Sequence, residues 1–303
     1  MRAIVTGGAG FIGSHLVEAL LARGDEVHIV DDLSSGKRER VPATAELHVR
    51  DVRDQLDDLA AAVRPDAILH LAAQADVRVS VAEPARDAAI NVVGTVNVLE
   101  AARVAGARVV FASTGGAIYG ECVRPAREED PREPLSPYGA AKLAGEEYLA
   151  AFARLHGAAH ASLRFGNVYG PRQDPHGEAG VVAIFLGRLH EGEPCRIFGD
   201  GKQTRDYVYV ADVVDALAAA LDCRQGGVFN VGTGTETSVL ELYDACRAVA
   251  GSTASPAHEA ARPGELARSV LDGGLAEREL GFRARTGLPD GLALTWSWLL
   301  QQD

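Results

Sequence analysis

The chain has 303 residues, of which 24% are charged and 47% are hydrophobic, and its formal net charge is −12. This composition is ordinary for a globular protein, and the length allows one large domain or two unequal ones. The acidic balance argues against a nucleic-acid-binding surface, which needs a basic face.

The four cysteines are widely scattered and form no CxxC pair, so we expect reduced thiols, a cytoplasmic location and no metal site. A strand pattern begins directly after Met1, and we therefore expect no signal peptide. No apolar run in the sequence approaches the length of about 20 residues that crosses a membrane, so no membrane partner is expected.

Short apolar runs alternate with helical patterns through the first half of the chain. This alternation predicts a parallel sheet with helices on both of its faces. Ser136 and Pro137 suit the N-cap and first position of a further helix that runs to about Leu155. The expected strands are Arg2–Thr6, Glu26–Asp31, Glu46–Arg50, Ala67–Leu71, Ala107–Ser113 and Ala159–Phe165, and the other helices are near Phe11–Arg23, Gln55–Val63 and Arg86–Ala105.

The pattern changes after Asn167, where a long polar loop is followed by short elements with glycine- and proline-rich joints. We therefore expect an α/β fold, in which a doubly wound parallel (Rossmann) sheet carries a smaller mixed α/β lobe over the carboxyl ends of its strands. The sheet domain is assigned to residues 1–166, with a return segment near 205–235, and the lobe to residues 167–204 and 236–303.

A glycine-rich loop lies between the first predicted strand and helix. Its glycines satisfy both Gly8-x-Gly10-x-x-Gly13 and Gly7-x-x-Gly10-x-x-Gly13. Such a loop lets the backbone approach a pyrophosphate and presents free helix N–H groups to it, although glycines can also serve tight turns alone. The two residues that open the helix, Phe11 and Ile12, are included in the predicted dinucleotide site.

Asp31 ends the second strand, about 20 residues beyond the loop, where a carboxylate can accept hydrogen bonds from ribose hydroxyls. A carboxylate there repels a 2′-phosphate and favours NAD over NADP. Asp32 could share this role. The positive charge of Arg38 leaves NADP as an alternative cofactor. The other predicted cofactor contacts are Asp51, Val52, Leu71, Ala72, Ala73, Ser113 and Asn91, the last of which could instead be a satisfied core asparagine.

Tyr138 and Lys142 lie four residues apart, so they share one face of the predicted helix. A buried ammonium beside a phenol favours the phenolate and supplies a base near neutral pH. Together with the glycine loop, this pair indicates redox chemistry on a hydroxyl group.

These stretches resemble the extended short-chain dehydrogenase/reductase superfamily, and within it the bacterial UDP-glucose (UDP-galactose) 4-epimerases. The resemblance covers essentially the whole chain and is carried by Thr6–His15, His70–Ala73, Ala112–Gly120, Ser136–Lys142, Arg164–Arg172, Ile197–Val210 and Arg262–Leu266. It implies that Tyr138 takes the proton of the sugar 4-hydroxyl while hydride moves to NAD. The 4-keto sugar then turns over and receives hydride on its other face, while Lys142 holds the nicotinamide ribose and keeps Tyr138 acidic.

The chain departs from the family pattern beside Tyr119, because Gly115 stands where relatives carry a catalytic Ser or Thr. Thr114 is our candidate for the missing hydroxyl, with Ser113, a water or Tyr138 alone as alternatives. Related 4,6-dehydratases carry an Asp-Glu pair where Gly115 and Gly116 stand, and related decarboxylases carry a glutamate at Ala117. Epimerisation is the reaction that needs neither group.

The resemblance also implies a nucleotide-sugar site. Arg205 and Arg262 would clamp the diphosphate, as guanidinium groups do well, although each could instead be a solvated surface charge. Ser269 stands where the family gates sugar size and would leave room for an N-acetyl group. The remaining assigned residues are Glu265 at a ribose hydroxyl, Asn167 at a phosphate or sugar oxygen, Arg196, Ile197 and Phe198 at the uracil, and Val181.

The sequence therefore predicts an NAD-retaining UDP-hexose 4-epimerase that acts on UDP-glucose and UDP-galactose and extends to UDP-GlcNAc and UDP-GalNAc. By resemblance, we expect a homodimer formed through Arg86–Ala105 and Pro137–Leu155. The alternatives are a 4-epimerase of another nucleotide sugar, such as UDP-glucuronate, and a non-catalytic NAD-sensing protein.

Overall fold

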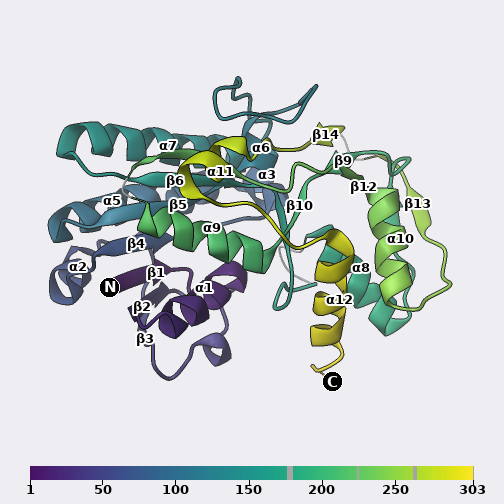
Figure 1. The fold of residues 1–303 in the computed structure, drawn as a ribbon, viewed down its shortest axis with the longest axis horizontal. Coiled ribbons are helices and arrows are strands. Elements are labelled where there is room, and N and C mark those ends of the chain that lie inside the picture. The colour runs from purple at the N-terminus through teal and green to yellow at the C-terminus, as the bar shows by residue number, and fades with distance from the viewer. Residues whose placement is uncertain (176–179, 224, 262–264, 303) are drawn as a thin grey trace.

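The computed structural model describes residues 1–175, 180–223, 225–261 and 265–302, and its centre is a seven-stranded sheet (Figure 1). Every neighbouring pair of strands in this sheet is parallel, in the order β11-β6-β5-β4-β1-β2-β3. The strands are β1 (Arg2–Thr6), β2 (Glu26–Asp31), β3 (Glu46–Val49), β4 (Ala67–His70), β5 (Arg108–Thr114), β6 (Ala161–Phe165) and β11 (Gly227–Val231). The chain reverses its direction of winding between β1 and β4, which is where such sheets bind ligands.

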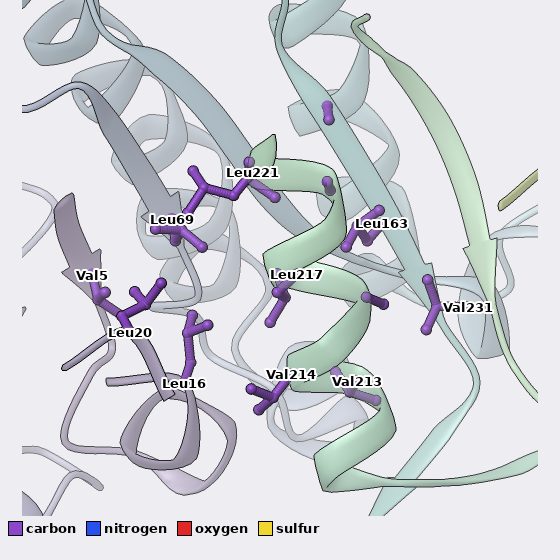
Figure 2. Close-up of a cluster of buried hydrophobic side chains, with 14 of the residues drawn as sticks. Val5, Leu16, Leu20, Leu69, Leu163, Val213, Val214, Leu217, Leu221 and Val231 are labelled. Atoms are coloured by element: carbon purple, nitrogen blue, oxygen red, sulfur yellow. The ribbon is translucent and has the colours of Figure 1, made fainter. Parts of the chain in front are cut away.

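Helices cover both faces of the sheet, as the sequence predicts. One face carries α1 (Phe11–Ala22), α9 (Val210–Asp222) and α11 (Gly274–Leu280), and the other carries α2 (Asp57–Val63), α5 (Gly94–Ala105) and α7 (Pro137–His156). Figure 2 shows Leu16 of α1 and Leu217 of α9 packed against strand residues such as Leu69. Burying a leucine side chain of this kind contributes about 1.5–3 kcal/mol to stability, so this interior fixes the strand ends that build the site.

The helix predicted at Arg86–Ala105 is longer and less regular than expected. It consists of α4 (Pro84–Ala88), a π-helical turn at Ala89–Val93 and α5, and it follows an unpredicted short helix, α3 (Val77–Ala82). The helix Pro84–Ala105 has 22 residues, and an 18-residue window within it has a mean hydropathy of 1.2, so by length and composition alone this helix could cross a membrane. This helix packs against α2, α7 and the sheet, and 39% of the apolar window is buried.

A smaller mixed lobe follows β6 and lies beside the sheet (Figure 1). In it, β7 (Asn167–Tyr169) pairs with β10 (Tyr207–Tyr209), and β8 (Arg196–Phe198) pairs with β13 (Ala257–Glu259). Strand β9 (Thr204–Arg205) lies between β12 (Thr237–Ser238) and β14 (Arg268–Ser269). Helices α8 (Val181–Glu191), α10 (Val239–Val249) and α12 (Leu288–Leu299) complete the lobe.

The segment for which a return to the sheet was predicted supplies α9 and β11, and β11 pairs with β6. The predicted α/β fold class is confirmed. Whether residues 1–166 and the lobe behave as separate domains stays a prediction.

Candidate active site

The glycine loop is shaped by close backbone contacts. Gly7 has φ +70°, and a Cβ atom on it would lie 2.7 Å from the backbone nitrogen of Ala72. A Cβ on Gly13 would lie 2.0 Å from the carbonyl oxygen of Gly7. These two glycines therefore let α1 and the end of β4 close tightly around the loop.

The loop also fits a diphosphate group. A Cβ on Gly10 would meet only the carbonyl oxygen of Gly7, at 3.1 Å, so the space in front of α1 is open there. Helix α1 has no side-chain cap and no acidic residue in its first turn. The first N–H groups of the helix, near Phe11 and Ile12, are thus available to an anion.

Asp31 is buried at the end of β2, with 6% of its surface exposed. Its two carboxylate oxygens accept hydrogen bonds from the N–H groups of Ala9 and Leu33, both at 2.9 Å. Burial raises the pKa of Asp31, and these two N–H donors oppose that effect. Asp32 is exposed and accepts hydrogen bonds from Ser34, so it shapes the turn after β2.

Two predicted adenine contacts lie after β3. The Asp51 carboxylate is held by the Arg53 side chain, which lowers its pKa. The side chain of Val52 belongs to the core between α2 and α5, and its carbonyl accepts a hydrogen bond from Asn97 at 3.0 Å. Val52 therefore has only its backbone to offer a ligand.

The segment after β4, which contains Leu71, Ala72 and Ala73, is held by hydrogen bonds to Thr6 of β1. The Thr6 hydroxyl accepts hydrogen bonds from the N–H groups of Leu71 and Ala72, both at 3.2 Å, and lies 2.7 Å from Nδ1 of His70. Burial, together with the charge of Lys142, lowers the pKa of His70 to about 3, so its imidazole is neutral.

Asn91 lies in the π-helical turn and is 1% exposed. Its amide nitrogen donates to the Gln74 carbonyl and the Asp87 carboxylate, both at 2.9 Å, and its amide oxygen accepts from the Gln74 N–H at 3.0 Å. The structure thus favours the satisfied core asparagine over a direct cofactor contact. Asn91 fixes the end of the segment that follows β4.

Tyr138 and Lys142 lie in the first turns of α7, as predicted. The Ser136 hydroxyl accepts a hydrogen bond from the Gly139 N–H at 3.2 Å, and Pro137 occupies the first helical position. A Cβ on Gly139 would lie 2.4 Å from the carbonyl oxygen of Ala117, so glycine lets α7 contact α6 (Gly115–Ile118) closely. The helix start is therefore anchored directly beside the end of β5.

The Lys142 side chain is buried. Its ammonium donates to the Ala112 carbonyl at 3.0 Å and lies 6.0 Å from the centre of the Tyr138 ring. Burial lowers the pKa of Lys142 to about 8, although the carboxylates of Asp87 and Glu146 oppose the shift. An ammonium in this position favours the phenolate form of Tyr138.

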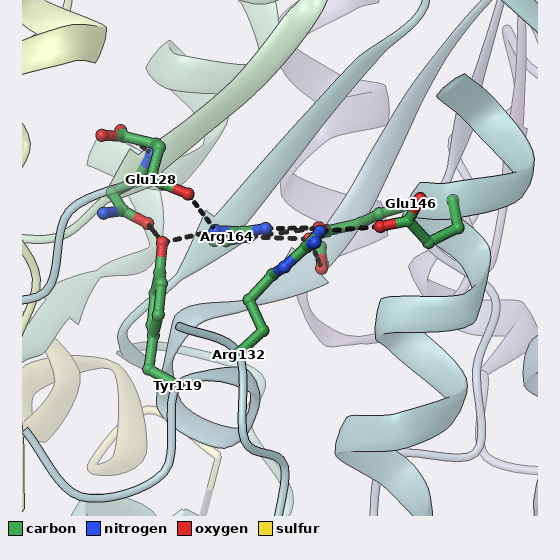
Figure 3. A network of polar contacts seen from close by, with 8 residues as sticks. Tyr119, Glu128, Arg132, Glu146 and Arg164 are labelled. Atoms are coloured by element: carbon green, nitrogen blue, oxygen red, sulfur yellow. Dashed lines mark hydrogen bonds and ion pairs between the residues drawn. The ribbon is translucent and has the colours of Figure 1, made fainter. Parts of the chain in front are cut away.

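A buried polar network supports this pair (Figure 3). Arg164 of β6 lies between Tyr119 and Glu146, with an Arg164–Glu146 ion pair of 2.6 Å and a hydrogen bond to the Tyr119 hydroxyl of 2.6 Å. The Ser113 hydroxyl donates to Glu146 at 2.6 Å, and Tyr119 donates to Asn230 of β11 at 2.8 Å. Burial alone would lower the pKa of Arg164, but its bonds to Glu146 raise it. The network joins β5, α7, β6 and β11, and Ser113 belongs to it.

The glycine pair after Thr114 has two different environments. A Cβ on Gly115 would lie 2.5 and 2.6 Å from the two Cδ atoms of Leu271, whose side chain fills that position. A Cβ on Gly116 would meet only Asn167 Oδ1 at 3.6 Å and Thr114 Oγ1 at 3.8 Å. Among the described residues the Thr114 hydroxyl has no hydrogen-bond partner, so it is available to a ligand.

Part of the predicted substrate set is brought together by β9 and β14. Arg205 and Ser269 are paired in register, and an Arg205 Nη atom lies 3.6 Å from Glu265 Oε1. Asn167 lies at the start of β7, facing Gly116, and its side-chain amide has no hydrogen-bond partner among the described residues. Val181 is the first residue of α8.

Other predicted substrate residues are placed differently. Arg196 is exposed and pairs with Glu259 at 3.2 Å. Ile197 is fully buried in the apolar core of the lobe, so only its backbone can reach a ligand. Phe198 is half-buried at the end of β8. Arg262 lies outside the described residues.

Several buried charged residues that hold the site together were not predicted from the sequence. Asp206 is 1% exposed, and its carboxylate accepts hydrogen bonds from the N–H groups of Thr233, Gly234 and Leu271. Asp87, Glu146 and Arg164 are also buried. Their signal in the sequence is a charge within an apolar pattern, most clearly Arg164 inside a buried strand.

Comparison with known proteins agrees with this geometry. Residues 3–232 match the sequence profile of the NAD dependent epimerase/dehydratase family. A UDP-glucose 4-epimerase of Mycolicibacterium smegmatis is 48% identical over 304 residues, which cover 97% of each chain.

Two solved structures are similar over nearly their whole length. A UDP-glucose 4-epimerase of Thermotoga maritima with UDP-glucose has a TM-score of 0.98 and 45% identity, with 100% of this chain and 99% of that chain covered. A UDP-glucose 4-epimerase of Thermus thermophilus in complex with NAD has a TM-score of 0.94 and 46% identity, with 99% of each chain covered. With its dinucleotide loop and its Tyr138–Lys142 pair, the chain belongs to the NAD dependent epimerase/dehydratase family.

Proposed function

We propose that this protein is an NAD-dependent 4-epimerase of UDP-hexoses, with UDP-glucose and UDP-galactose as its substrates. The observation that carries the proposal is the Tyr138–Lys142 pair at the start of α7, where the buried Lys142 ammonium donates to Ala112 of β5 and α7 contacts α6, the short helix that Thr114 precedes at the end of β5. The relatives with the highest similarity reported above are UDP-glucose 4-epimerases.

The residues of the chain have distinct tasks in this reaction. NAD, when bound, accepts hydride from the sugar and returns it. Tyr138 takes the proton of the 4-hydroxyl and gives it back after the keto sugar has turned over. Lys142 keeps Tyr138 acidic and has further N–H groups for the nicotinamide ribose, since one already donates to Ala112. Thr114 orients the reacting oxygen by a hydrogen bond.

Competing reactions of the family lack their catalytic groups here. Dehydration needs an acid and a base where Gly115 and Gly116 stand, and Leu271 fills the space beside Gly115. Decarboxylation needs a carboxylate at Ala117, which has none. Epimerisation requires only the tyrosine, the lysine and a hydroxyl group.

The nucleotide sugar would bind between α6 and the lobe. Arg205, backed by Glu265, supplies the positive charge for the diphosphate, with Arg262 as the second predicted clamp. Ser269 is paired with Arg205 and is small, which supports acceptance of UDP-GlcNAc and UDP-GalNAc. Equal assays of both sugar pairs test this extension, and undetectable turnover of the N-acetyl pair would remove it.

We also propose a cytoplasmic homodimer. Its interface would be formed by residues 86–105 and 137–155, which expose Val93, Val104, Tyr148 and Leu155. Sedimentation of the wild type and of Leu155→Glu tests this assembly: we expect a dimer that the variant weakens, and a wild-type monomer would contradict it.

The central experiment identifies the bound nucleotide of the purified protein and assays the protein against a panel of UDP-sugars. Tyr138→Phe should lower kcat by about 10²–10⁴-fold, because it removes the acid–base group, whereas Tyr148→Phe on the exposed part of the same helix should not. Thr114→Val should lower kcat and Thr114→Ser should largely retain it. Unchanged turnover in Tyr138→Phe would contradict the mechanism.

A further inference from the structure

Four polar side chains share one face of the edge strand β3 and its neighbour β2. His28 pairs in register with Glu46, and Glu26 and His48 lie two residues away along their own strands. Alternate residues of a strand point to the same side, so all four lie on one face. The next residue of β2 on this face, Val30, belongs to the core under α2 and α5. The polar cluster therefore lies where the helical cover of the sheet ends.

The donor atoms of this cluster are close together. Nδ1 of His28 lies 3.1 Å from Nε2 of His48 and 3.5 Å from an oxygen of Glu46, and Nε2 of His48 lies 3.7 Å from the other oxygen of Glu46. A tetrahedral ion with ligand distances of about 2.0–2.2 Å holds its ligand atoms about 3.4 Å apart. The three separations lie on either side of that value.

The outer contacts of the cluster suit metal coordination as well. Nε2 of His28 lies 3.1 Å from Glu26, and Glu26 pairs with Arg2 at 3.0 Å. A carboxylate at the far nitrogen of a histidine fixes the tautomer that presents the other nitrogen to a metal. The nearby cation Arg50 is paired with Asp58 at 2.9 Å, which reduces its repulsion of an ion.

We propose that His28, His48 and Glu46 form a binding site for Zn²⁺ or a similar divalent transition metal ion, with water at the fourth position. Two imidazoles and one carboxylate are a donor set that such ions accept, whereas Mg²⁺ and Ca²⁺ prefer oxygen ligands alone.

Binding replaces the hydrogen bond between the two imidazoles by the ion and releases no proton. With the Nε2 proton of His28 directed to Glu26, the hydrogen between the two rings belongs to Nε2 of His48. Metal binding moves that hydrogen to Nδ1 of His48 and replaces the N–H···N bond by two nitrogen–metal bonds, with no change of oxidation state.

The site would clamp the edge strand to its neighbour. Strand β3 has a single partner in the sheet, β2, and the ends of these strands lead to Asp31 and Asp51. An ion bound by both strands adds a link that the hydrogen-bond ladder alone does not supply. Because it binds only the folded chain, it raises the unfolding temperature.

Titration of the chelator-dialysed full-length protein with ZnCl₂, followed by calorimetry and thermal unfolding, tests the proposal. We expect saturable binding of one ion and a rise in unfolding temperature, with tetrahedral absorption bands on titration with CoCl₂. His48→Gln and Glu46→Gln, both near the surface, should abolish or strongly weaken the binding, and Glu26→Gln should weaken it by about 10–100-fold. The control His156→Gln, on the exposed end of α7, should bind like the wild type.

Two results would overturn the proposal. One is a wild-type protein without saturable Zn²⁺ binding. The other is a His48→Gln variant that binds Zn²⁺ with wild-type affinity, because the ion would then be held elsewhere. MgCl₂ should produce neither the binding heat nor the thermal shift, and equal effects of Mg²⁺ would also count against the assigned donor set.

Discussion

The contact between Gly115 and Leu271 predicts the result of restoring the family's serine. In Gly115→Ser the new Cβ would lie 2.5 Å from a Leu271 Cδ atom, far inside van der Waals contact. Leu271 is 1% exposed, packs against Tyr119 and Ala126, and has its N–H bonded to Asp206, so its side chain has little freedom to move. We expect Gly115→Ser to lower the free energy of unfolding by about 1–3 kcal/mol, as overpacked cores do.

Truncating Leu271 should relieve that clash. Leu271→Ala alone leaves a cavity and should cost about 2–5 kcal/mol. In the double variant the serine occupies part of the cavity, so the combined loss should be smaller than the sum by about 0.5–3 kcal/mol. Gly116→Ser is the matched control, because its Cβ meets nothing closer than 3.6 Å, and it should change stability little.

Urea unfolding of the NAD-saturated variants measures these differences in the free energy of unfolding. The unfolding curves recorded by fluorescence and by circular dichroism should coincide, as a two-state transition requires. Additive losses in Gly115→Ser and Leu271→Ala would refute the steric explanation of the glycine. The turnover number kcat of the same variants is a second measurement. Thr114→Val removes the hydroxyl at position 114, and Gly115→Ser with Leu271→Ala introduces one at position 115. If a hydroxyl at either position can serve the reaction, the combination of all three substitutions should have a higher kcat than Thr114→Val alone.

Three further predictions concern buried polar groups. Burial lowers the pKa of Lys142 from 10.5 to about 8, so the charged side chain lowers the free energy of unfolding by up to about 3 kcal/mol at pH 7. Lys142→Met should therefore be inactive but more stable than the wild type. Between pH 8 and 10.5 the folded wild type binds fewer protons than the unfolded chain, so its stability should rise with pH and the advantage of the variant should shrink; a pH-independent difference in urea unfolding would contradict this. Asn91→Ala should lower stability by about 1–3 kcal/mol because buried partners are left unpaired, and loss of bound NAD without loss of stability would instead indicate a direct cofactor contact. Arg164→Met should cost about 3–5 kcal/mol because the buried Glu146 carboxylate loses its ion-pair partner, and adding Glu146→Met should recover part of that loss in the same unfolding assay.

The sheet and the start of the site could be predicted because their signals are local. The strand and helix patterns repeat over a few residues, and the predicted Arg2–Thr6 and Glu26–Asp31 agree with β1 and β2. Ser136 and Pro137 likewise begin α7 as their cap chemistry predicts. Boundaries shifted by one or two residues elsewhere, where the pattern fades gradually into a loop.

The parts that could not be predicted depend on partners distant in the chain. The absence of a hydroxyl at Gly115 is visible in the sequence. Its cause is the side chain of Leu271, which lies far away in the chain, near the C-terminus. Asn91 has the same sequence signal whether it binds a cofactor or Gln74. The burial of Ile197 could not be read from a strand of three residues, because so short a segment does not reveal which face is covered.

The buried carboxylate of Asp206 has a consequence for how the enzyme can move. It lies between β9 and β10, and it bonds to the segment after β11 and to the segment after β14. A rotation of the lobe about the sheet would have to break several of these bonds together. The joint at Asp206 is therefore a poor hinge, and opening of the site for product release should come from movements of segments farther from it.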